Sequence, residues 1–153
     1  MALIAFDSIE VAATPEAVWT VITDILNSAN VISGIKTIEI LEVPSGPTIT
    51  GVKWKETREF MGQDAVETMW ITDAHEPSFY ETRAESHGSV YISRMELEPT
   101  SKGTCLTMKF NCEPETFGAK TMWLLTGWMA KRSLSKVIGQ DLADIKTAVE
   151  AAS

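Results

Sequence analysis

The spacing of apolar residues changes twice along the chain, and the first block predicts a strand followed by two short helices. The strand is expected over residues 3–12. Thr14 is a good helix N-cap and Pro15 suits the first helical position, so a helix should run from there to about residue 24. Apolar residues continue at helical spacing, which predicts a second short helix over residues 26–32.

The second block, residues 35–113, consists of runs of seven to ten residues that are separated by turn signals rich in glycine and proline. This pattern predicts an antiparallel meander of six strands. The third block returns to helical spacing and predicts a helix over residues 117–151, about 50 Å long at 1.5 Å per residue. Its apolar stripe comprises Leu134, Ile138, Leu142, Ile145 and Val149.

Each hairpin turn determines which residues face each other across the strands, so the meander has a predicted register. A turn at residues 61–62 sets Trp54 against Met69 and Glu56 against Glu67. A turn at residues 87–88 likewise sets Tyr80 against Met95, Thr82 against Ser93 and Ala84 against Tyr91. One face then collects Trp54, Met69, Ile71, Tyr80, Met95, Leu97, Leu106, Met108 and Phe110. The other face is mostly charged or hydroxylated, so we expect a sheet with one dry side.

Length and composition favour one globular domain over residues 1–153, because 44% of the residues are apolar. The net charge of −8 and the scattered basic residues argue against nucleic acid or an anionic membrane surface as the main partner. No apolar run approaches the ~20 residues of a membrane span. The amino terminus lacks the basic segment of a signal peptide, so we expect a cytoplasmic protein.

The two cysteines, Cys105 and Cys112, are predicted to be free thiols. They lie seven residues apart in one predicted strand, which separates them by roughly 23 Å and points them to opposite faces. Neither has a neighbouring cysteine or histidine at metal-ligand spacing. We therefore expect neither a disulfide nor a metal site, and nothing in the sequence calls for a cofactor.

Four segments resemble the START-like superfamily, also called the helix-grip or SRPBCC group. They are residues 13–24 with a Val-Trp pair, residues 51–58, the Gly-Thr at 103–104, and residues 140–146. The resemblance implies an α+β helix-grip fold, in which a curved antiparallel sheet of about seven strands wraps around a long C-terminal helix. It also implies a central cavity for a lipid, polyketide or similar hydrophobic molecule. The branch that the chain resembles most is the bacterial polyketide cyclase/dehydrase and lipid-transport group.

A polar group is predicted on the inward face of the sheet. Glu56 and Glu67 face each other there, and Arg58 is diagonal to Glu67 and within reach of it. Two carboxylates so close resist joint ionisation unless Arg58 neutralises one of them. Three interpretations stay open: a structural cluster near the open rim of the sheet, a polar anchor for a ligand, or the acid and base of an enzyme.

The remaining candidate ligand contacts are wall residues. Tyr80, Tyr91 and Ser93 would present hydroxyls, and Trp54, Met69, Met108 and Phe110 would present apolar surface. Leu124 and Gly127 would contribute from the first half of the long helix. Residues 121–130 are apolar on more than one side, which suggests either burial under the sheet and loops, a lid over the cavity, or contact with the second subunit of a homodimer. Gly127 inside a helix suggests a bend or space for ligand.

Three functions are compatible with these features. The first is a non-enzymatic binder or carrier of a small hydrophobic molecule. The second is an enzyme of the polyketide cyclase/dehydratase type that uses the inward polar residues. The third is a protein-interaction module similar to the chaperone activators of the superfamily, for which a filled core is expected.

Overall fold

Alternating residues of the first and second blocks form one curved antiparallel sheet. The computed structural model describes residues 2–60, 62–86 and 88–152, with the exception of the side chains of residues 2–4, 123–128 and 130. Within this part of the chain the sheet has seven strands, in the order β1-β7-β6-β5-β4-β3-β2. They are β1 (Ala2–Val11), β2 (Ile35–Glu42), β3 (Lys53–Phe60), β4 (Gln63–His75), β5 (Phe79–Ser86), β6 (Ser89–Thr100) and β7 (Gly103–Pro114).

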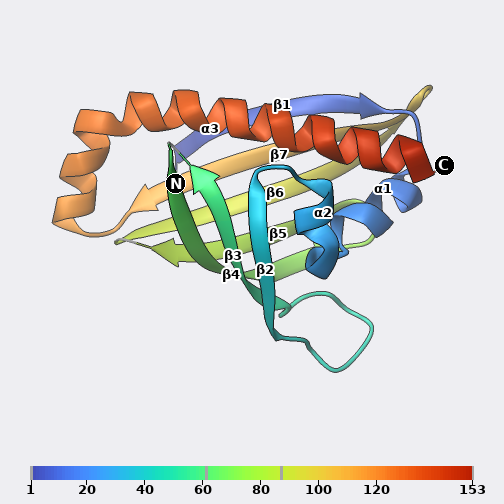
Figure 1. Cartoon of the computed structure of the whole chain (residues 1–153), viewed down its shortest axis with the longest axis horizontal. Helices are drawn as coiled ribbons and strands as arrows, with labels where there is room; N and C mark the ends of the chain where they lie inside the picture. The colour runs from blue at the N-terminus through green and yellow to red at the C-terminus, as the bar shows by residue number, and fades with distance from the viewer. Residues whose placement is uncertain (1, 61, 87, 153) are drawn as a thin grey trace.

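The long helix α3 (Phe117–Ala152) lies across the concave side of the sheet, next to β1. Figure 1 also shows that the beginning of α3 turns away from the axis of its remainder, and that the short helices lie near its C-terminal end. The predicted α+β fold with a sheet gripping a C-terminal helix is therefore confirmed. None of the helices in the described part of the chain combines the length and the apolar character that a membrane span requires.

The first short helix, α1 (Pro15–Ile22), begins as its sequence predicts. The side-chain oxygen of Thr14 accepts a hydrogen bond from the backbone N–H of Ala17, and Pro15 occupies the first helical position. The second predicted helix is broken into two pieces, a 3-10 turn η1 (Ile25–Asn27) and a single turn α2 (Ser28–Val31). Neither piece has a side-chain cap hydrogen bond at its start.

Both predicted hairpin registers are confirmed. Trp54 pairs with Met69 and Glu56 with Glu67 across β3 and β4. Tyr80 pairs with Met95 across β5 and β6. The inward and outward assignments therefore hold, because a slip of one residue would have exchanged the two faces of the strand.

The turn into β7 explains the Gly-Thr at residues 103–104. Gly103 has φ +147°, and a Cβ there would overlap the carbonyl oxygen of Val11. Thr104 is fully buried and its hydroxyl donates to the carbonyl oxygen of Ala13. This pair of residues thus joins the end of β1 to the start of β7.

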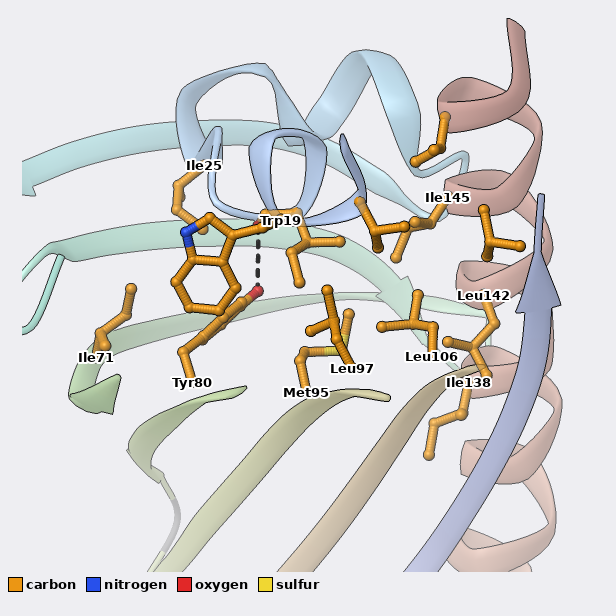
Figure 2. Packing of buried hydrophobic residues seen from close by; sticks show 14 of the residues in the cluster. Trp19, Ile25, Ile71, Tyr80, Met95, Leu97, Leu106, Ile138, Leu142 and Ile145 are labelled. Carbon is orange, nitrogen blue, oxygen red and sulfur yellow. Dashed lines mark hydrogen bonds between the residues drawn. The ribbon is translucent and has the colours of Figure 1, made fainter. Parts of the chain in front are cut away.

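The predicted stripe of α3 supplies the packing between helix and sheet. Ile138, Leu142, Ile145 and Val149 are each exposed by 3% or less. Figure 2 shows Ile138 and Leu142 beside Leu106 of β7, and Trp19 of α1 beside Tyr80 of β5. The two rings meet edge to face, with centroids 6.0 Å apart.

The cysteines are both free, as predicted. Cys112 is buried on the concave face, and Cys105 is partly exposed.

Candidate functional site

A cavity of about 690 Å³ lies between the concave face of the sheet, α3 and the segment that contains α1, η1 and α2. Most of its described wall is apolar. The segment that contains the short helices contributes Val21, Ile22, Ile25, Val31 and Ile32, and α3 contributes Leu134, Val137, Ile138 and Ile145.

Ten of the twelve predicted site residues line this cavity: Trp54, Glu56, Arg58, Glu67, Met69, Tyr80, Tyr91, Ser93, Met108 and Phe110. The side chains of the other two, Leu124 and Gly127, lie outside the described residues. The register therefore brings the predicted set together on one wall. Contact of these residues with a ligand stays a prediction.

A buried ion-pair cluster connects the sheet to α3 at the wall of the cavity. Arg58 donates from Nε to Glu56 Oε2 at 3.1 Å. Its Nη1 and Nη2 donate to the two oxygens of Asp141 at 3.2 and 3.1 Å, which is the bidentate geometry that a guanidinium makes with a carboxylate. Trp54 completes the cluster, because its indole N–H donates to Glu56 Oε1 at 3.5 Å.

The predicted location and composition of this cluster need correction. The structure gives Arg58 two partners, Glu56 and Asp141, whereas the sequence suggested that Glu67 would be the carboxylate within its reach. The cluster is also not at a wet rim, since the side chains of Arg58 and Asp141 are 18% and 4% exposed. Glu67 lines the cavity opposite Glu56 in the strand register.

Asp141 lines the cavity and belongs to this cluster, and the sequence analysis missed it. It follows Ile138 by three residues and precedes Ile145 by four, so it lies on the apolar face of α3. A carboxylate at that position requires a partner when the face is buried. This signal was present in the sequence, but it did not identify Arg58, which is 83 residues away in the chain.

Burial and the neighbouring opposite charges shift the pKa values of Arg58 and Asp141 in opposite directions. Burial alone would lower the pKa of the Arg58 guanidinium, but Asp141 and Glu56 outweigh burial and raise that pKa. Burial raises the pKa of the Asp141 carboxyl above its usual range, while Arg58 acts in the opposite direction. The cluster therefore holds one permanent cation between two carboxyl groups.

Three hydroxyl groups of the wall, those of Tyr80, Thr82 and Ser93, are engaged with protein atoms. Tyr80, whose hydrogen bond is dashed in Figure 2, donates to the carbonyl oxygen of Ile22 at 3.2 Å. Burial raises the pKa of its phenol, so the group stays protonated. Thr82 and Ser93 are hydrogen-bonded to each other across β5 and β6. Burial also raises the pKa of Tyr91, whose ring lies 5.7 Å from that of Phe110. These residues suit the wall of a binding site better than a nucleophile or base.

Among the described residues, no group of three or more histidine, cysteine or acidic side chains is arranged to hold a metal ion.

Comparisons with known proteins connect this fold and cavity to a family. Residues 6–150 match the sequence profile of the family described as polyketide cyclase / dehydrase and lipid transport. No curated protein shows significant sequence similarity to the chain.

Several solved structures share the fold. A START superfamily protein from Mycobacterium smegmatis has a TM-score of 0.80 at 17% identity, with 97% of this chain and 98% of that chain covered. The Zhui aromatase/cyclase from Streptomyces sp. R1128 has a TM-score of 0.71 at 16% identity, with 95% and 92% covered. The di-domain ARO/CYC StfQ from the steffimycin biosynthetic pathway has a TM-score of 0.79 at 12% identity, and the match covers 97% of this chain and 50% of that one. At these identities the likeness shows the fold.

Proposed function

Because the chain belongs to the polyketide cyclase / dehydrase and lipid transport family, we propose that it binds or carries a small hydrophobic molecule between the sheet and α3. The observation that supports this most directly is the cavity. Its volume of about 690 Å³ is within the range of small-molecule sites, and its apolar wall carries few polar groups. The residues that would contact the molecule are the ten predicted wall residues, together with Asp141 and the apolar residues of α1 and α2.

Native mass spectrometry of the freshly purified protein would test this proposal, followed by identification of any molecule released on denaturation. An uncharged apolar fluorophore, N-phenyl-1-naphthylamine, should in addition bind and raise the melting temperature. Binding to the folded form alone stabilises it by about 2.7 kcal/mol at a hundredfold excess over the dissociation constant.

A cavity-filling variant makes the test specific to this site. Ala84 is buried on β5 and lines the cavity, so Ala84→Leu should weaken fluorophore binding. Ala151→Leu adds the same side chain at an exposed position of α3 and serves as the control. Equal binding by both variants, or no binding by the parent protein, would argue against the proposal.

An enzyme of the cyclase/dehydratase type is the second candidate, and the placement of Glu56 opposite Glu67 favours it. In an enzyme, Glu67→Gln should preserve ligand binding and abolish turnover, because an acid or base acts on charge that develops in the transition state. In a carrier, the same substitution should change affinity only for ligands with a polar group. We favour the carrier, since Glu56 already pairs with Arg58 and Tyr80 with Ile22.

The third candidate, a protein-interaction module, has less support. A filled core was expected for such a module, whereas this chain encloses a cavity of about 690 Å³. A homodimer that forms through the beginning of α3 stays a prediction. Met122 and Met129 there are 61% and 42% exposed. The cytoplasmic location and the absence of a nucleic-acid partner also remain predictions. Sedimentation analysis would test the homodimer, and a mobility-shift assay would test binding to nucleic acid.

A further inference from the structure

The charge balance of the cavity wall limits which ligands it can accept. Among its described residues, the acidic side chains are Glu56, Glu67 and Asp141, and Arg58 is the one basic side chain. Residues 123–128, whose side chains are not described, include no ionisable side chain in the sequence. Even if one of the three carboxyl groups is protonated, the described part of the wall carries no net positive charge.

Arg58 is the natural partner for an anionic ligand, but three of the five N–H groups of its guanidinium are already engaged within the protein. Three of its N–H groups donate to Glu56 and Asp141. The backbone of Gly34 also lies against it, since a Cβ on that glycine would be 3.3 Å from Nη1. A ligand carboxylate that took Arg58 would leave Asp141, whose side chain is 4% exposed, buried without its partner.

An uncharged group of the wall, the hydroxyl of Tyr80, also disfavours a ligand that can only accept hydrogen bonds. Tyr80 uses its one hydrogen on the carbonyl oxygen of Ile22, so its oxygen is left as an acceptor. Ser93 and Thr82 share a hydrogen bond with each other. Of these hydroxyls, that of Tyr80 can therefore meet a ligand as an acceptor, which favours a ligand that donates hydrogen bonds.

We propose that the cavity selects hydrophobic molecules whose polar group is an uncharged or cationic hydrogen-bond donor, such as an alcohol, phenol or amine, and discriminates against carboxylates. This inference rests on the proposed binding function and specifies its ligand class. The physical reason is that charges in a partly buried site are screened much less than charges on the surface. A carboxylate would therefore be repelled by the wall, and an ammonium group would be attracted to it.

Three ligands with the same chain provide the test: decylamine, decanol and decanoate. Each would be titrated at neutral pH against the protein loaded with N-phenyl-1-naphthylamine, and the displacement of the fluorophore would be measured. Decylamine and decanol should bind at least tenfold more tightly than decanoate. Decanoate binding as tightly as decylamine would overturn this inference and leave the proposed function intact. Failure of the fluorophore and of all three ligands to bind would overturn both.

A pair of matched variants assigns the selectivity to the wall. Glu67→Gln removes one carboxylate charge from the cavity and keeps the shape of the side chain, so the ratio between decylamine and decanoate affinities should fall several-fold. Glu59→Gln makes the same change at an exposed position of β3 that does not line the cavity, and the ratio should stay unchanged. An equal ratio in both variants and in the parent protein would also overturn the inference.

Discussion

The same strands build both a packed region and a hollow region of the concave face. In the packed region, Val11, Ile71, Leu97 and Leu106 of the strands are buried together with Val18, Trp19, Leu142 and Val149 of the helices, and each is exposed by 6% or less. None of these residues lines the cavity. On β7, Leu106 is fully buried, whereas Met108 and Phe110, two and four residues further along the same face, line the cavity. On β4, Ile71 is likewise buried in the packed region, and Met69 on the same face lines the cavity.

The two regions are held together by different forces. In the packed region, apolar side chains of the sheet contact the stripe of α3 directly, so burial of apolar surface provides the stability. Beside the cavity, the connections between the sheet and α3 include the ion pair of Arg58 with Asp141. Beside the cavity, this buried polar link joins helix and sheet where the packed region has apolar contacts. This difference shows how one sheet can supply both a stable core and space for a ligand.

The largest expected effect comes from removing the polar link. Arg58→Met leaves Asp141 buried without its cationic partner and leaves Glu56 with the hydrogen bond from Trp54, so the free energy of unfolding should fall by roughly 3 to 5 kcal/mol. Arg83→Met is the control, because Arg83 pairs with the more exposed Glu85 and should lose less than about 1 kcal/mol. Urea denaturation of both variants would measure the difference. Similar losses would mean that the link contributes no more than a surface ion pair.

A second pair of variants compares the two regions along β7. Leu106→Ala opens a void in the packed region and should lower the free energy of unfolding by roughly 2 to 5 kcal/mol. Met108→Ala should cost less, because Met108 already borders empty space and loses fewer contacts.

Fluorophore binding should show the opposite order, with a larger change for Met108→Ala than for Leu106→Ala. Denaturation curves and binding isotherms on the same samples would check both statements. If Met108→Ala were the more destabilising variant, the division into a packed and a hollow region would be wrong.

The smallest expected effect concerns Asp144, which ties α3 to the segment beside the cavity. Its carboxylate accepts hydrogen bonds from the backbone N–H and the hydroxyl of Ser33, at 2.8 and 2.7 Å. Burial alone would raise the pKa of Asp144, but the bonds from Ser33 and Gln140 outweigh it and lower that pKa. A lowered pKa means that the carboxylate stabilises the fold above its ordinary pKa, and that this contribution is lost as pH falls through the lowered value.

Asp144→Asn should therefore lower the free energy of unfolding at neutral pH by less than about 1 kcal/mol. Between neutral pH and pH 3, the variant should lose less stability than the parent protein does. Urea denaturation at both pH values would measure this. An identical loss in the two proteins would show that the Ser33 contact adds nothing to stability.

The local features of this protein followed from the sequence because each depends on residues that are close together in the chain. The N-cap at Thr14 joins residues three apart, and the hairpin registers depend on turns whose positions the sequence marks. The stripe of α3 needs only the helical period. Ten wall residues followed from these registers, since alternation places them on one face.

The sequence did not distinguish the packed region from the hollow one. Leu106 and Met108 obey the same alternation, and the difference between them depends on how far the curved sheet lies from α3 at each point. Asp141 became the partner of Arg58 for the same reason, because the path of α3 brings together two residues that no local pattern connects. The sequence by itself determined the strands, the helices and the faces they present. The tertiary structure alone decided where those faces meet and where they stay apart, because sheet curvature and helix path arise from the packing of the whole chain.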